Sequence, residues 1–477
     1  MKVGMISLGC PKNLVDSEVM LGLAEQAGHT LTSEAADADV LIVNTCAFID
    51  RSKQESVDAI LEMAQLKKTG RCRQLVVTGC LAERYRDELK AQIPEIDALL
   101  GTGEVPEIVR ALGTEGSDPA VPKPLMGNGA VPMTLHRKSR HQPLGGRAQL
   151  PTYIYDAQTP RRLATPGHYA YVKVAEGCDY TCAFCIIPRL RGPYRSRPAD
   201  QIVREARRLA DGGVKELLLI SQDTTFYGND LGERGALARL LRELNRVDGL
   251  EWIRLPYLYP TTIDQAMLEA MADSDKVCKY IDLPLQHASD AVLRRMKRPG
   301  TRRGYERLLQ DIRTRMPEVA LRSTFIVGFP GETEADVAEL EGLLDSVGFD
   351  HVGVFTYSHE EGTTAGGWND DVPAAVKAAR RDRLMARQRG IVASAQQARI
   401  GRRVRLMVDG PAPDHALVLQ GRLSTQAPDI DPVVYLTDCD PSTLRAGQLL
   451  DAEVVGARGY DLIARPLLSP QAVCYHQ

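Results

Sequence analysis

The chain has 477 residues, of which 44% are hydrophobic and 25% charged, and its formal net charge is −3. This length exceeds one ordinary core and predicts two to four globular domains, while the near-neutral charge excludes a surface that coats nucleic acid generally. No apolar run approaches the roughly 20 residues that cross a bilayer, and the first residues lead into a strand without a signal-peptide pattern, which predicts a cytoplasmic protein.

Residues 1–111 alternate short apolar runs with amphipathic stretches. Strands are predicted at Val3–Leu8, Val40–Asn44 and Gln74–Thr78, and helices at Val15–Ala27, at Ser56–Gln65 and from about Ala82. Such alternation is typical of a parallel α/β sheet.

A cysteine follows each of these three strands within two residues, at Cys10, Cys46 and Cys80. Because ligand sites of open α/β sheets lie at the carboxyl ends of the strands, we expect the three thiols to converge. A cysteine at one strand end is usually a small buried residue. The shared position of all three favours a metal site instead, in which three thiolates hold an iron–sulfur cluster with one open iron.

Residues 112–166 contain eight prolines and many glycines, and they lack periodicity. We interpret them as a linker. The βα alternation returns in residues 167–398 and predicts a TIM-like partial (β/α)6 barrel. Its predicted strands are Ala170–Val174, Glu216–Ile220, Trp252–Leu255, Tyr280–Leu283, Ser323–Val327 and Val352–Thr356, with helices such as Ala199–Ala210 and Glu334–Ser346 between them.

The first barrel strand is followed by Cys178, Cys182 and Cys185, in the pattern C-x3-C-x2-C. Three thiolates on one loop can hold three irons of a [4Fe-4S] cluster and leave the fourth open. A structural zinc site is the alternative, but it usually takes four ligands in two pairs, and the next cysteine is Cys278. The loop resembles that of the radical S-adenosylmethionine (SAM) enzymes, in which Cys178, Cys182 and Cys185 would be catalytic.

Residues 399–467 form short β-rich runs at Val404–Val408, Ala416–Leu419, Val433–Thr437 and Leu450–Val455. They predict a small antiparallel β-barrel of about five strands, followed by a tail at 468–477. This region has eight Lys or Arg and nine Asp or Glu residues, without the basic excess that an RNA-binding barrel needs. The cluster Asp429, Asp431, Asp438 and Asp440 suits a basic protein partner, or is an ordinary solvated surface.

Nearly the whole chain, apart from the linker and the last residues, resembles the radical SAM methylthiotransferases, whose C-terminal barrel is a TRAM domain. The resemblance rests on Leu8–Glu18, Asn44–Cys46, Thr78–Cys80 and the Cys178 loop. Within this family, Gly9–Asn13, Cys185–Pro188 and Ile220–Thr224 are similar to the RimO branch, which modifies a ribosomal protein. Other branches modify adenosine in transfer RNA, and that activity is the alternative.

The resemblance implies two [4Fe-4S] clusters, on Cys178, Cys182 and Cys185 and on Cys10, Cys46 and Cys80. It also implies two SAM molecules for each methylthio group, which is added to the β-carbon of an aspartate in the twelfth small-subunit ribosomal protein, free or in the subunit. One SAM supplies the methyl group and one the radical, and sulfur comes through the N-terminal cluster. The expected partners are a flavodoxin-like electron donor and a sulfur donor, and the chain is expected to be a monomer that binds no membrane. A non-enzymatic iron–sulfur scaffold is disfavoured by the open-iron spacing and the six-unit barrel.

The resemblance also predicts cofactor contacts, and each has a structural alternative. Phe184 would lie near the adenine or fill the loop. Gln222 and Asp223 would bind the SAM amino group or form a strand-end turn. Arg254 would contact SAM or the substrate carboxylate, or make a structural ion pair.

Further contacts are predicted at the later strands. Gln286 and the neighbouring His287 end the fourth strand, and Arg322 opens the fifth. Gly328 and Glu332 would contact SAM, although a glycine turn and an acidic first turn are also ordinary helix-capping chemistry. The basic runs Arg189–Gly192 and Met296–Arg298 are interpreted as solvated surface, and the resemblance raises a substrate-facing role for Arg189–Gly192 as the alternative.

Overall fold

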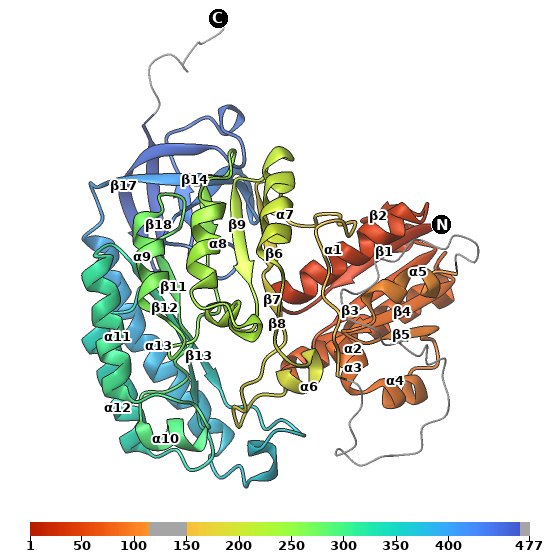
Figure 1. The fold of residues 1–477 in the computed structure, drawn as a ribbon, viewed down its shortest axis with the longest axis horizontal. Helices are drawn as coiled ribbons and strands as arrows, with labels where there is room; N and C mark the ends of the chain where they lie inside the picture. The colour runs from red at the N-terminus through yellow and green to blue at the C-terminus, as the bar shows by residue number, and fades with distance from the viewer. Residues whose placement is uncertain (114–149, 468–477) are drawn as a thin grey trace, which may run out of the picture.

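The computed structural model describes residues 1–113 and 150–467, and Figure 1 shows them as three bodies along the chain. The N-terminal body is red to orange, the central barrel runs from yellow to cyan, and a small C-terminal barrel is blue. Residues 114–149 of the predicted linker and the predicted tail lie outside the described residues. None of the described helices is both long and apolar enough to span a membrane.

The N-terminal body is a parallel sheet with five strands within residues 1–113. In order across the sheet they are β2 (Thr30–Thr32), β1 (Lys2–Ser7), β3 (Val40–Thr45), β4 (Gln74–Gly79) and β5 (Ala98–Leu100). Its helices are α1 (Pro11–Gln26), α2 (Asp50–Thr69), α3 (Cys80–Arg84), α4 (Arg86–Gln92) and α5 (Ile108–Ala111). The three predicted strands correspond to β1, β3 and β4.

Both faces of this sheet are buried, as is usual for parallel strands. Along β3, Val40 and Ile42 share a core with α1, whereas Leu41 and Val43 share one with α2. The period-two alternation of a strand thus sends successive apolar side chains to opposite helices.

The central body is a barrel of six parallel strands within residues 150–467. They form two three-stranded sheets: β6 (Tyr169–Lys173), β9 (Glu216–Ile220) and β10 (Trp252–Arg254), then β11 (Tyr280–Asp282), β12 (Ala320–Val327) and β13 (His351–Thr356). A single bridge between Ile253 and Val277 lies between the two sheets. Among the described residues β6 and β13 do not pair, so the barrel is open, as predicted.

Helices cover the outside of this barrel (Figure 1). They are α7 (Ala199–Asp211), α8 (Ala236–Leu244), α9 (Gln265–Asp273), α10 (Asp290–Arg295), α11 (Arg302–Arg315), α12 (Glu334–Val347) and α13 (Ala374–Gln397). In α7, Ile202, Ala206 and Leu209 are buried at helical spacing. The start of α12 is fixed by a capping box between Thr333 and Asp336.

The C-terminal body is a closed barrel whose five strands lie within residues 399–467. Its order is β14 (Arg403–Ala412), β15 (His415–Leu423), β16 (Val434–Leu436), β18 (Asp461–Pro466) and β17 (Leu449–Arg458). Its pairings are antiparallel except for the parallel pair of β16 and β18. The predicted small β-barrel is thus confirmed, with one parallel pairing added.

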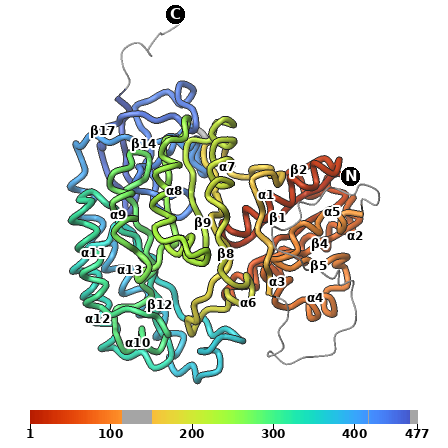
Figure 2. Tube along the Cα trace, viewed as in Figure 1, coloured from red at the N-terminus to blue at the C-terminus, as the bar shows by residue number. Residues whose placement is uncertain are grey.

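Helix α1 lies against the inner face of the barrel beside β6 (Figure 2). Val15 and Val19 share a core with Tyr171 of β6 and Ile220 of β9. Residues of the 150–166 segment cross α1 so closely that a Cβ on Gly22 would lie 2.5 Å from the backbone nitrogen of Arg161. The N-terminal body therefore closes the open side of the barrel.

Candidate active site

The loop with Cys178, Cys182 and Cys185, which we call the barrel thiols, follows β7 (Ala175–Glu176) beyond β6. Gly177 begins it with φ of +89°, and a Cβ there would lie 2.0 Å from the Pro193 carbonyl oxygen, so only glycine fits. Cys178 donates its backbone N–H to Gly192 at 3.1 Å, and Ala183 donates to Met296 at 2.8 Å. Because both ends of the loop are held, the three half-buried thiols have a fixed arrangement.

The barrel thiols influence one another electrostatically. Burial, together with the neighbouring Cys182, raises the pKa of Cys178 to about 11 and that of Cys185 to about 12. A bound cation reverses this effect, since a coordinated thiol is deprotonated. Arg298 donates from Nη1 to the Cys182 sulfur at 3.8 Å and lies 4.0 Å over the Tyr259 ring.

Cys10, Cys46 and Cys80, the N-terminal thiols, directly follow the adjacent strands β1, β3 and β4. A Cβ on Gly9 would lie 3.1 Å from the Cys46 sulfur, and Cys80 donates to the Asn13 Oδ1 at 3.7 Å. Cys10 is exposed, whereas the other two are buried. The strand order thus brings together the three thiols that the sequence predicts to converge.

Burial also raises the pKa values of two N-terminal thiols, Cys46 and Cys80. It raises the pKa of Cys80 to about 12, which the Arg191 guanidinium opposes and the neighbouring Cys10 and Cys46 reinforce. The pKa of Cys46 is likewise raised, mainly by burial. A donor set of three soft thiols, one of them facing solvent, fits a cluster with one open iron.

Within the described residues no three His, Cys, Asp or Glu side chains converge on one point as ligands of a single metal ion do.

Arg191 follows the barrel-thiol loop in the sequence and contacts one of the N-terminal thiols. It ends α6 (Ile187–Arg191), just after the barrel thiols, and its Nη2 lies 3.8 Å from the Cys80 sulfur. Its Nη1 donates to Asp16 at 2.6 Å and to Glu176 at 3.3 Å, and Lys173 donates to the same two carboxylates at 2.5 Å. This buried network joins α1 to β6 and to the barrel-thiol loop. Its members are Asp16, Lys173, Glu176 and Arg191.

The interpretation of both basic runs as solvated surface is therefore wrong for two residues. Arg191 is 3% exposed and Arg298 is 8% exposed, and each contacts one set of thiols. Nothing in their local sequence signals this burial, because their partners come from distant parts of the chain.

Gln222 and Asp223, the predicted SAM contacts after β9, differ from each other in their hydrogen-bond partners. Gln222 donates to Glu176 at 2.5 Å, and its buried Oε1 has no partner among the described residues. Asp223 caps the short helix Thr224–Phe226, accepting N–H groups from Thr225 and Phe226 and the hydroxyl of Tyr180 at 2.8 Å. Burial raises the pKa of Asp223, and the hydrogen bonds from Thr225 and Tyr180 oppose that rise.

Arg254 and Arg322 point toward the C-terminal barrel. Arg254 is fully buried, donates to Glu216 at 2.7 Å and also donates to the Ser424 carbonyl. Arg322 pairs with Asp282 at 2.8 Å and with Asp431 at 3.2 Å. These contacts are those of the structural ion pair considered for Arg254.

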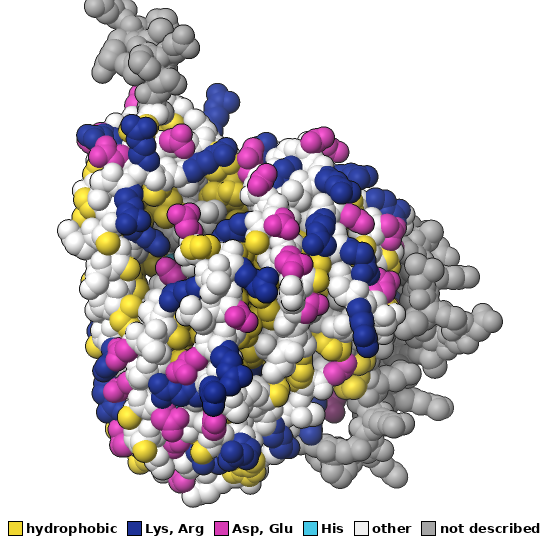
Figure 3. All heavy atoms as spheres, turned by 60° about the vertical axis from the view of Figure 1, so that its left-hand side comes forward, with side chains coloured by type: hydrophobic (Ala, Val, Ile, Leu, Met, Phe, Trp, Pro, Cys, Tyr) yellow, Lys and Arg dark blue, Asp and Glu magenta, His cyan; other side chains and the backbone are white. Residues whose placement is uncertain are grey.

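Two of the four clustered acidic residues of the C-terminal barrel, Asp429 and Asp431, lie at the same junction between this barrel and the central barrel. Asp429 accepts the hydroxyls of Tyr169 and Tyr171, and Asp431 accepts that of Tyr280 at 2.6 Å. The interpretation as surface for a basic partner is therefore wrong for Asp431, whose side chain is 1% exposed, whereas Asp429 remains exposed at this junction. Figure 3 shows acidic and basic side chains interspersed over the face that it draws.

The remaining predicted contacts lie around β12. Gln286 has a φ of +76° and pairs with β12 through its backbone, and its side chain makes no hydrogen bond to described residues. Gly328 donates its backbone N–H to Glu332 at 2.9 Å, and Glu332 also accepts from Arg380. His287 lies 3.3 Å from Glu332 in the core. Glu332 and Gly328 thus take part in packing against α13.

Phe184, between two barrel thiols, packs partly buried against Met296 and Phe329. This contact is the loop-filling alternative for Phe184, although part of the ring stays accessible.

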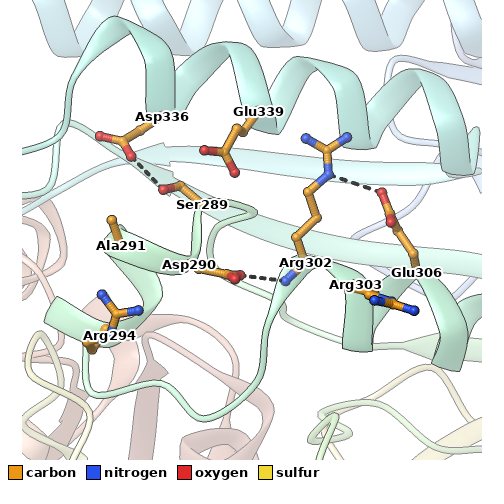
Figure 4. A pocket seen from close by; sticks show the side chains of 9 residues that line it. All are labelled: Ser289, Asp290, Ala291, Arg294, Arg302, Arg303, Glu306, Asp336 and Glu339. Atoms are coloured by element: carbon orange, nitrogen blue, oxygen red, sulfur yellow. Dashed lines mark hydrogen bonds and ion pairs between the residues drawn. The ribbon is translucent and has the colours of Figure 1, made fainter.

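A groove of about 720 Å³ opens between α10, α11 and α12 on the outside of the barrel (Figure 4). Within it, Arg302 pairs with Glu306 at 3.0 Å, and Ser289 donates a hydrogen bond to Asp336. No thiol lines it, so the chemistry is assigned to the sets of cysteines instead.

Models of three families match successive parts of the chain. The family described as uncharacterized protein family UPF0004 matches residues 2–101, the radical SAM superfamily matches residues 172–344, and the TRAM domain matches residues 400–467. The first match contains the N-terminal thiols and the second contains the barrel thiols.

Curated relatives match almost the whole chain, and three of them bear the same name, ribosomal protein uS12 methylthiotransferase RimO. The relative from Koribacter versatilis (strain Ellin345) is 45% identical, over 98% of this chain and 96% of its own. That from Symbiobacterium thermophilum is 49% identical, over 97% and 90%. That from Desulforamulus reducens is 46% identical, over 97% and 98%.

Solved structures share the fold at low identity. A radical SAM methyltransferase, TsrM, from Kitasatospora setae, with cobalamin and a [4Fe-4S] cluster bound, matches with a TM-score of 0.52 and 17% identity. The match covers 74% of this chain and 72% of that chain.

Proposed function

Because this chain belongs to the RimO family of radical SAM methylthiotransferases, we propose that it adds a methylthio group to the β-carbon of an aspartate in ribosomal protein uS12. The observation that carries the proposal is the presence of two three-cysteine sets, with Arg191, just after the barrel-thiol loop, in contact with Cys80 of the other set. One set suits radical formation and the other suits sulfur delivery.

The barrel thiols fit a [4Fe-4S] cluster, since three thiols lie on one rigid loop and are accessible. The chemistry that this cofactor supplies when bound is one-electron cleavage of SAM, which yields a 5′-deoxyadenosyl radical able to abstract hydrogen. Gly177 and the hydrogen bond from Cys178 to Gly192 hold the loop in place for it. Arg298 supplies a fixed positive charge beside Cys182.

The N-terminal thiols fit a second [4Fe-4S] cluster by the same criteria of donor type and number. The chemistry that it would supply when bound is the provision of sulfur for transfer. Asn13 ties the thiol loops together, because its Nδ2 donates to the carbonyls of Leu8 and Thr45 and its Oδ1 accepts from Cys80. The buried pairs of Asp16 then fix this body against the barrel.

Of the predicted SAM contacts, we retain Gln222, Gln286 and Phe184 as direct ones. Gln222 has an unpartnered buried oxygen, and the other two keep accessible side-chain surface. We assign Asp223, Gly328 and Glu332 to positioning, because each is engaged in backbone capping or packing. Arg254 and Arg322 are assigned to the junction with the C-terminal barrel.

The proposed reaction consumes two SAM molecules for each product, one for the radical and one for the methyl group. It therefore needs an electron donor, for which a flavodoxin-like protein is proposed, and a sulfur donor. We propose that the chain works as a monomer in the cytoplasm.

The test is turnover of the reconstituted protein, with SAM, a reductant and sulfide, on uS12 and on transfer RNA in parallel. Mass spectrometry of uS12 should show a gain of one methylthio group on an aspartate, and 5′-deoxyadenosine should form in proportion. A methylthio group on transfer-RNA adenosine, with uS12 unchanged, would overturn the proposal.

A further inference from the structure

Lys12 is a largely buried lysine whose ammonium has no anionic partner among the described residues. It lies in the first turn of α1, is 6% exposed, and its Nζ stands 2.9 Å from the centroid of the Tyr257 ring. Among the described residues it makes no ion pair or hydrogen bond through Nζ. An ammonium taken from water without a partner is costly, so the site needs a compensating group.

The carboxylates nearest to Lys12 are already used. Asp16 and Glu176 each accept from both Lys173 and Arg191. Asp282 accepts from Arg322 and from a backbone N–H. Lys173, Arg191 and Arg322 thus each pair with a carboxylate, whereas the Lys12 ammonium has no ion pair among the described residues.

Tyr257 is held in a conformation that a tyrosine seldom adopts. Its φ is +62°, and its N–H donates to the Asp282 Oδ2 at 2.9 Å. Strain of this kind persists where the surroundings over-determine it, most often at functional sites. The fold therefore fixes the position of the Tyr257 ring beside the Lys12 ammonium.

Lys12 also lies near residues that adjoin each set of thiols in the sequence. It lies two residues after Cys10, and the charges acting on it include those of Cys10 on one side and Glu176, two residues before Cys178, on the other. A carbon that receives a sulfur from one set after losing hydrogen to a radical made at the other must lie in this region.

We propose that Lys12 binds the side-chain carboxylate of the residue that is modified, which makes it the specificity-determining residue for an acidic substrate. This inference rests on the proposed function. In aspartate the β-carbon is bonded to the carboxylate carbon, so an anchored carboxylate fixes the C–H bond that reacts. The alternative is that Lys12 only balances the negative charge of Cys10.

A double-mutant cycle separates these roles. Binding of a synthetic uS12 peptide, and of the same peptide with asparagine in place of the aspartate, is measured on the reconstituted unaltered chain and on the Lys12→Met and Lys12→Arg variants. Lys68→Met, at an exposed lysine of α2, is the matched control. Iron per chain is measured for every protein.

The unaltered chain and the Lys68→Met control should prefer the aspartate peptide by roughly 10- to 100-fold, as expected for a desolvated ion pair. Lys12→Met should bind the two peptides equally, and Lys12→Arg should restore part of the preference. Iron content should be the same throughout.

Retention of the full preference by Lys12→Met would overturn the inference, because the carboxylate would then be recognised elsewhere. Loss of iron from Lys12→Met, with the preference intact in the remaining holoprotein, would assign Lys12 to charge balance instead. If the unaltered chain methylthiolates neither the aspartate peptide nor uS12, the proposed function itself fails. That result is obtained before any variant is compared.

Discussion

At the scale of single residues, two arginines stand out because each places a guanidinium 3.8 Å from a cysteine sulfur. Arg191 contacts Cys80, and Arg298 contacts Cys182. A guanidinium stays charged when buried and has several donors in a fixed plane, which a lysine lacks. Each set of thiols therefore has one permanent cation beside it.

Replacing the two sets of cysteines by alanine should have different consequences. With Cys178, Cys182 and Cys185 changed, SAM cleavage should fall to background, since the ligands of the radical-forming cluster are gone. With Cys10, Cys46 and Cys80 changed, SAM cleavage should persist but sulfur transfer should stop. Each variant should bind about half the iron of the unaltered chain, because one of two sets remains. The measurements are iron analysis and quantification of 5′-deoxyadenosine and methylthiolated product.

Two results would contradict this division of labour. Sustained 5′-deoxyadenosine formation without the barrel thiols would refute the radical assignment. Unchanged iron content without the N-terminal thiols would refute the second cluster. Alanine at Cys72, a buried cysteine outside both sets, is the matched control and should retain both activities.

The cysteines could be predicted from the sequence because their spacing is local or repeats after successive strands. The buried arginines could not. Arg191 is buried only because Asp16 and Glu176, from two different bodies, neutralise it. Arg254 was placed correctly on a strand, but its partners Glu216 and Ser424 could not be read from strand periodicity.

At the scale of elements, α1 contributes to every part of the site. Its first turn follows Cys10, Asp16 in its middle pairs across to the barrel, and Glu18 accepts from Arg161. Its C-terminal half passes under the 150–166 segment at Gly22. The helix is therefore bound on one side by its sheet and on the other by the barrel and that segment.

Two helical glycines should respond oppositely to substitution by alanine. Gly22→Ala should destabilise the protein by about 1–3 kcal/mol, because its Cβ would lie 2.5 Å from backbone atoms of Pro160 and Arg161 that cannot move aside cheaply. Gly390→Ala, in α13 with no atom within 4 Å of its Cβ, should stabilise by about 0.5–1 kcal/mol through helix propensity alone.

Urea unfolding followed by circular dichroism measures both changes. Since the substitution is chemically identical, the Gly390 variant is the control for propensity. Equal stabilisation by both would show that the 150–166 segment does not lie on α1 in solution.

Element positions followed from periodicity wherever an element is long and buried. The predicted strand Glu216–Ile220 is reproduced as β9, and the predicted helix Ala199–Ala210 is extended by one residue in α7. The short edge strand β2 was not predicted, because its three residues are too few for a pattern and none is buried. Strand β18 ends at Pro466, a residue that disfavours a strand interpretation.

At the scale of the whole molecule, three buried ion networks hold the N-terminal body to the barrel. Asp16 joins the first, described above. In the second, Arg161 bridges Glu18 and Glu205. In the third, Lys53 and Arg84 both pair with Glu360, which is 2% exposed, at 2.9 Å. Breaking one partner of such a pair leaves a buried charge uncompensated and typically costs about 3–5 kcal/mol.

These networks should make the assembly sensitive to acid. Burial opposes the ionisation of Glu205 and Glu216, yet the guanidinium groups around each outweigh it and lower both pKa values. The pKa of Glu176 is lowered in the same way by Lys173 and Arg191. A lowered folded-state pKa contributes stability above the ordinary value of 4.5 that is lost as pH falls below it, at about 1.4 kcal/mol for each unit of difference.

The midpoint temperature of thermal unfolding should therefore change little between pH 7 and pH 5 on account of these groups. It should fall steeply below about pH 4.5. Calorimetry at constant ionic strength measures it. Glu205→Gln is the matched variant: it should be less stable at pH 7 and lose less stability on acidification. An acid slope unaffected by this substitution would refute the role given to Glu205.

Although the three family models match separate stretches, the chain is not divisible at their borders. A fragment that begins at the central barrel would keep Lys173 and Arg191 but lack their partner Asp16. A fragment that ends before the C-terminal barrel would lack Arg422 of that barrel, which pairs with Glu216 at 2.7 Å, and would expose Arg254 and Glu216. Exchanging one module for that of another enzyme would meet the same difficulty, since the incoming surface must carry matching charges at each buried position. The modules are thus expected to diverge together, with compensating changes on both sides of each junction.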